Sequence, residues 1–85
     1  MGFVLNGGIT PLLEALKTHA LNEDVCFSVC ASIELLGLSE ICVNKVIEKN
    51  GIILVIGAIQ NHIASENVCY SGCSAIMALT NNSTK

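Results

Sequence analysis

The sequence repeats itself after forty-three positions. Residues 23–38, EDVCFSVCASIELLGL, return as residues 66–81, ENVCYSGCSAIMALTN, and Phe27 is matched by Tyr70. Aligning residues 3–42 with residues 46–85 gives eleven identical pairs in forty without any gap. An ungapped period of about forty residues is typical of chains that stack copies of one small unit, each of which cannot bury its apolar face alone. We therefore expect two copies that pack against each other.

Apolar residues recur at helical spacing within each copy. Residues 9, 12, 13 and 16 occupy positions i, i+3, i+4 and i+7 of a helix. The matching helix covers residues 52–61, and we expect its apolar run at residues 52–59, IILVIGAI, to be a buried helix face. His19 and His62 close these two helices, where a partly cationic ring is favoured.

A second helix follows in each copy after a short polar break. Asn22 and Ser65 are suitable N-cap residues, and Gly37 and Asn81–Asn82 indicate the ends of these helices. Residues 41–50 predict a short helix between the copies, and residues 2–6 look like the remnant of the same short helix. Each copy is thus expected to contain three helices.

Length and charge limit the classes of protein that this chain can represent. Eighty-five residues make at most one domain, and no stretch reaches the ~20 apolar residues of a membrane span. A net charge of −3 with four Lys and Arg argues against binding to a phosphate backbone. We therefore expect neither a nucleic-acid nor a membrane partner.

The five cysteines lie within helical patterns. Cys26/Cys30 and Cys69/Cys73 are each spaced i, i+4, so each pair shares one helix face. Equivalent positions on stacked helices lie on the order of 8–10 Å apart, too far for four thiolates to close a tetrahedron around zinc. We expect reduced core thiols in a cytoplasmic protein, without cofactor or metal. A thiol or metal site on these four cysteines is an alternative.

The arrangement resembles the armadillo repeat. The junction NKVIEKNGI at residues 44–52, the stretches NGGI and PLLEAL at residues 6–9 and 11–16, and residues 23–36 carry the resemblance, which covers nearly the whole chain. It implies an all-α fragment of a right-handed superhelical solenoid with about six helices. Residues 1–85 would form a single array with units at approximately 1–40 and 41–85.

The resemblance also implies a function. In this family the third helices line a concave groove that binds extended peptides or partner proteins. Nuclear-import members carry Trp and, four residues later, Asn on that helix, but the matching residues here are Ala31 and Leu35, then Ser74 and Ala78. We do not expect import-type cargo recognition.

We expect a non-catalytic scaffold for protein–protein interaction. Its predicted partner-binding residues are Phe27, Ala31, Glu34, Leu35, Tyr70, Ser74, Met77 and Ala78. Phe27 and Tyr70 either anchor a partner or cover the edge of the neighbouring repeat. Apolar, uncapped ends predict self-association as well. An alternative is a regulatory segment of a larger enzyme, such as a kinase or a ubiquitin ligase.

Overall fold

The computed structural model describes residues 8–83, with side chains up to residue 80, and contains five helices and no strand within this range. The predicted all-α class is confirmed. The predicted short helix at residues 2–6 lies outside the described residues. The helices are α1 (Ile9–Thr18), α2 (Glu23–Leu36), α3 (Glu40–Glu48), α4 (Gly51–Asn61) and α5 (Glu66–Ser83).

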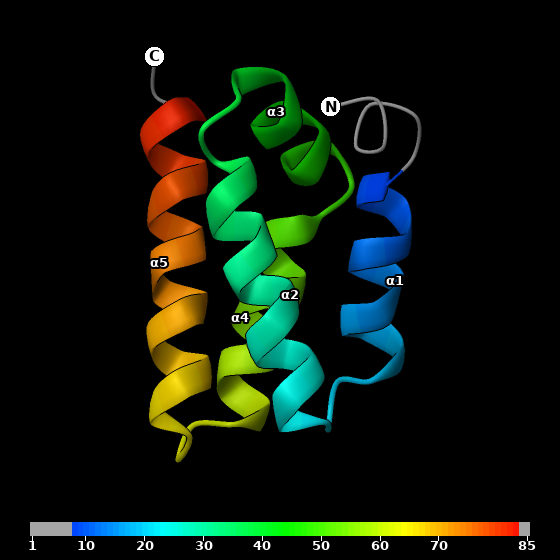
Figure 1. Cartoon of the computed structure of the whole chain (residues 1–85), viewed down its shortest axis with the longest axis vertical. Coiled ribbons are helices and arrows are strands. Elements are labelled where there is room, and N and C mark those ends of the chain that lie inside the picture. The colour runs from blue at the N-terminus through cyan, green and yellow to red at the C-terminus, as the bar shows by residue number, and fades with distance from the viewer. Residues whose placement is uncertain (1–7, 84–85) are drawn as a thin grey trace.

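The long helices form two layers (Figure 1). Helices α2 and α5 lie side by side in one layer, and α2 packs more extensively against α5 than any other two helices do among the described residues. Helices α1 and α4 lie behind them, and α3 crosses near one end. Helices at matching positions of the repeat run in the same direction (Figure 1). Equivalent helices of the two copies are also neighbours, since α2 contacts α5 and α1 contacts α4.

Local hydrogen bonds explain where the helices begin. The side chains of Asn22 and Ser65 accept from the N–H groups of Val25 at 3.0 Å and Val68 at 3.3 Å, which confirms both predicted N-caps. Ser39 caps α3 in the same way. The predicted end of α5 at Asn81–Asn82 is wrong, because the helix continues to Ser83.

The turn between α3 and α4 depends on a left-handed residue. Asn50 has a φ of 64°, a conformation that asparagine adopts more readily than most residues. The N–H of Asn50 donates to the carbonyl of Ile47, and the carbonyl of Asn50 accepts from Leu54, which joins the two helices without a longer loop.

A single apolar core lies between the layers and includes residues of all five helices. Its fully buried members include Leu16, Ile33, Val46, Val55 and Leu79. The prediction that residues 52–59 form a buried face is wrong at Ile53 and Ile56. Ile53 is 67% exposed and Ile56 is 42% exposed, because no described element covers those sides of α4.

Gly37 permits a close approach of α2 to α5. A Cβ atom placed on Gly37 would lie only 2.5 Å from the Cβ of Ala78. A side chain at Gly37 would therefore push the two helices apart, so the missing side chain helps to set how closely the two copies pack.

Candidate interaction surface

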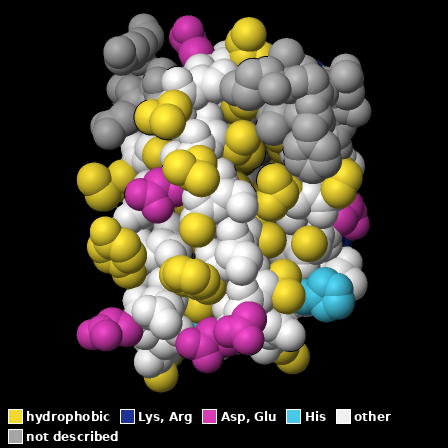
Figure 2. All heavy atoms as spheres, in the orientation of Figure 1, with side chains coloured by type: hydrophobic (Ala, Val, Ile, Leu, Met, Phe, Trp, Pro, Cys, Tyr) yellow, Lys and Arg dark blue, Asp and Glu magenta, His cyan; other side chains and the backbone are white. Residues whose placement is uncertain are grey.

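The eight predicted partner-binding residues lie on α2 and α5, the two adjacent helices of one layer. We call this set the α2–α5 surface: Phe27, Ala31, Glu34, Leu35, Tyr70, Ser74, Met77 and Ala78. Its large apolar members are exposed, with exposed fractions of 40% for Phe27, 70% for Leu35, 72% for Tyr70 and 63% for Met77. Figure 2 shows hydrophobic side chains over both helices on this side of the molecule.

Small residues separate the large ones. Ala31, Ser74 and Ala78 are partly buried, whereas the apolar side chains around them stand out into solvent. The surface is therefore a shallow shelf with apolar projections, and a partner would contact it mainly by packing against those projections.

Helices α2 and α5 carry charge of only one sign. Glu23, Asp24, Glu34 and Glu66 are their ionisable carboxylates, and neither helix contains Lys or Arg. All four carboxylates are exposed, and acidic groups are visible among the hydrophobic ones and at the ends of these helices (Figure 2). The side-chain charge carried by these two helices is therefore negative.

The first cysteine of each copy has a structural task. The Cys26 thiol donates to the carbonyls of His19 and Ala20 at 3.8 and 3.4 Å. The Cys69 thiol donates to the carbonyls of His62 and Ile63 at 3.6 and 3.5 Å. These carbonyls follow the ends of α1 and α4, so each thiol ties the loop after one helix to the helix that comes next.

The second cysteine of each copy differs between copies. Cys30 is fully buried and Cys73 is exposed, so the predicted core position is confirmed for Cys26, Cys30 and Cys42 and is wrong for Cys73. Burial, and secondarily the nearby Cys26, raises the pKa of Cys30 to about 11, and burial also raises the pKa of Cys26. Among the described residues, no group of three or more His, Cys, Asp or Glu side chains could hold a metal ion.

The two repeated histidines make the same backbone hydrogen bond, but the contacts of their imidazole rings differ. Both cap a helix, because the N–H of His19 donates to Ala15 and that of His62 donates to Ala58. The His62 ring also forms a 2.9 Å hydrogen bond through Nε2 with the carbonyl of Ala20 in the other copy, whereas His19 is exposed. Together with the 2.6 Å bond that Ser65 donates to Glu23, this contact links the loops of the two copies.

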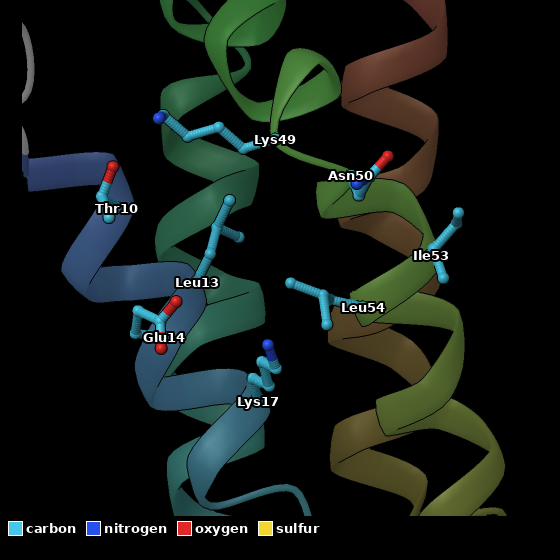
Figure 3. A pocket seen from close by; sticks show the side chains of 8 residues that line it. All are labelled: Thr10, Leu13, Glu14, Lys17, Lys49, Asn50, Ile53 and Leu54. Carbon is cyan, nitrogen blue, oxygen red and sulfur yellow. The ribbon is translucent and has the colours of Figure 1, made fainter.

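A cleft lies on the other side of the molecule, between α1 and α4. It has a volume of about 290 Å³, and Figure 3 shows Leu13 and Leu54 between the two helices. The charged groups along it are of both signs: Glu14, Lys17 and Lys49. The sequence did not predict this cleft, because its width depends on how far apart α1 and α4 lie rather than on a local pattern.

One apolar residue near the surface was missed. Leu38 is 88% exposed in the turn after α2 and follows Leu35 by three positions and Ala31 by seven. This helical spacing was the signal that could have extended the predicted stripe to Leu38.

Comparison with models of protein families, with curated proteins and with solved structures finds no match to this chain. None of the helices in residues 8–83 combines the length and the apolar character needed to span a bilayer.

Proposed function

We propose that this protein is a non-catalytic interaction module whose α2–α5 surface binds an extended peptide with both apolar and basic side chains. The observation that carries the proposal is the combination of four exposed large apolar residues with four carboxylates, and no cation, on two adjacent helices. We further propose that the two copies form part of a right-handed solenoid of armadillo type. The parallel neighbours α2 and α5 support this arrangement.

The apolar residues would supply anchor points. Phe27 and Tyr70 occupy matching positions of the two copies, so they present two aromatic rings at a repeated spacing. Aromatic residues are enriched among the few side chains that dominate binding energy in protein interfaces. A peptide that follows the repeat could place one apolar side chain beside each ring.

The carboxylates favour Lys and Arg in the partner. Complementary charge mainly speeds association and rejects partners of the wrong sign. Binding through exposed charges is weakened by salt. These two effects separate a basic peptide from one recognised by apolar contacts alone.

Two peptide libraries of matched length and apolar content test the proposal. One carries Lys and Arg at its charged positions, and the other carries Asp and Glu. Affinity selection followed by fluorescence polarisation should favour the basic library, and raising the salt concentration should weaken that binding. Equal selection of both libraries, or selection of the acidic one, contradicts the proposed partner.

Substitutions then place the binding site on the protein. Phe27→Ala/Tyr70→Ala should weaken the selected basic peptide by about tenfold or more, equivalent to at least about 1.4 kcal/mol. Ile53→Ala is the matched control, because Ile53 is also an exposed apolar residue but lines the α1–α4 cleft. If Ile53→Ala abolishes binding and the double variant does not, the cleft is the site and the α2–α5 surface is not.

We also propose that the protein self-associates. The exposed side chains of Ile56 on α4 and Cys73 on α5 support this, since their equivalents Leu13 and Cys30 are buried between the two copies. Mass measured by light scattering over a concentration series tests it.

A further inference from the structure

Equivalent residues of the two copies are not equally exposed, and the differences follow a pattern. Six residues that are buried in the first copy have more exposed equivalents in the second copy, and they lie on α1 and α2, the helices that pack against α4 and α5. We call these equivalents the C-terminal end face: Ile52, Ile56, Ile59, Cys69, Cys73 and Ile76. Their buried counterparts are Ile9, Leu13, Leu16, Cys26, Cys30 and Ile33.

The opposite pattern marks the other end of the molecule. Here the residues of the first copy are the more exposed ones, and we call them the N-terminal end face: Leu12, Val25, Ser28, Ser32 and Leu36. Their counterparts Val55, Val68, Ser71, Ala75 and Leu79 are buried. Figure 1 shows α5 and α1 at opposite edges of the molecule, so the two faces do not compete for the same space.

Each face keeps the chemistry of the packed interface inside the molecule. Leu13 is replaced by Ile56 and Leu16 by Ile59, whereas the two cysteines and Ile33 keep their identity at Cys69, Cys73 and Ile76. On the other face Val25, Ser28 and Leu36 are identical to Val68, Ser71 and Leu79. The two end faces therefore carry residues like those that pack α1 and α2 against α4 and α5. Ile56, Cys73 and Ser28 are exposed on them, and the other residues of the faces are partly buried.

The groups that form polar contacts between the two copies also have equivalents at the two end faces of the molecule. Inside the molecule the His62 ring bonds the Ala20 carbonyl, and Ser65 donates to the Glu23 carboxylate. At the matching positions, Ile63 and Glu66 offer a carbonyl and an exposed carboxylate at one end. His19 and Asn22 offer an exposed ring and an exposed amide at the other.

We propose that two molecules of this protein stack head to tail, with the C-terminal end face of one molecule on the N-terminal end face of the next. In this contact the His19 ring of the second molecule forms a hydrogen bond with the Ile63 carbonyl of the first. The Asn22 amide of the second molecule donates to the Glu66 carboxylate of the first. Such an interface is heterologous and leaves one face free at each end of the dimer, so further molecules can add to the stack. This inference refines the self-association proposed above and does not depend on peptide binding.

Two exposed positions allow each face to be blocked without disturbing the fold of one chain. Cys73→Glu places a charge on the C-terminal end face, at the repeat equivalent of the buried Cys30. Ser28→Glu places a charge on the N-terminal end face, at the repeat equivalent of the buried Ser71. Gln60→Glu is the matched control for charge, since residue 60 and its equivalent, Lys17, are both exposed.

Sedimentation velocity of the full chain is the readout. Wild type and Gln60→Glu should increase in mass with concentration and pass beyond the dimer. Cys73→Glu alone and Ser28→Glu alone should remain at 8.9 kDa. Their equimolar mixture should form a 1:1 dimer of twice that mass and stop there, because only one pair of intact faces is available.

Three results would overturn the inference. Monomeric wild type removes self-association altogether. Assembly of either blocked variant alone at wild-type strength shows that the molecules associate through another surface. A mixture that remains monomeric shows that the two faces do not bind each other. Peptide affinity measured on Cys73→Glu separates all three from a failure of the α2–α5 surface.

Discussion

The repeated cysteines and histidines are explained by the loops that they hold. Cys26 and Cys69 donate to carbonyls that follow α1 and α4, and His62 reaches a carbonyl of the other copy. Cys30 and Cys42 are also fully buried, and neither thiol donates such a bond among the described contacts. Cys30 packs within the apolar core. Its raised pKa has a consequence for stability.

Stability should fall as the pH rises from about 9 to about 11. The pKa of Cys30 is about 11 in the folded chain and 9.0 for an unperturbed thiol. Between these values the unfolded chain loses a proton that the folded chain keeps, which favours unfolding as the pH increases. Urea denaturation at several pH values should show a weaker pH dependence for Cys30→Ala than for wild type. Identical pH dependence in wild type and Cys30→Ala would contradict the buried position of this thiol.

At the scale of helices, the spacing of α2 and α5 depends on the absence of a side chain at Gly37. Gly37→Ala should lower the free energy of unfolding by about 1–3 kcal/mol, because the added methyl would overlap Ala78. Gly57→Ala is the control within α4, where an added Cβ meets nothing within 4 Å. It should raise stability by about 0.4–1 kcal/mol, since alanine favours a helix more than glycine does. Denaturant unfolding at one protein concentration measures both changes, and an unaffected Gly37→Ala variant would contradict the close approach.

The helices could be predicted from sequence because their signals are local. The caps at Asn22 and Ser65 and the apolar spacing of α1 each depend on a few neighbouring residues. The extent of α5 beyond Asn82 was not predictable in this way, since asparagine disfavours a helix only weakly. Element type was therefore easier to predict than element ends.

At the scale of the whole molecule, the repeat predicted which helices would be equivalent but not what would cover them. Cys30 and Cys73 have the same local pattern, yet α5 packs beside one and no described helix covers the other. The α1–α4 cleft is a similar case, because it arises from the distance between two helices. The positions of the α2–α5 surface were predicted from the resemblance to armadillo repeats, and the helical period only aligns Phe27 with Ala31 and Tyr70 with Ser74.

Both proposals depend on the parallel packing of α2 against α5, in the register that brings Gly37 to Ala78. Nuclear Overhauser effects measure this contact directly, and a mixture of labelled and unlabelled chains separates contacts within a chain from contacts between chains. We predict a strong intramolecular effect between the Gly37 α-protons and the Ala78 methyl group, and a second one between Gly72 and the Ile59 side chain. Absence of the Gly37–Ala78 effect in a folded chain, with Gly37 instead near residues of another helix, would contradict the stacking of the two copies.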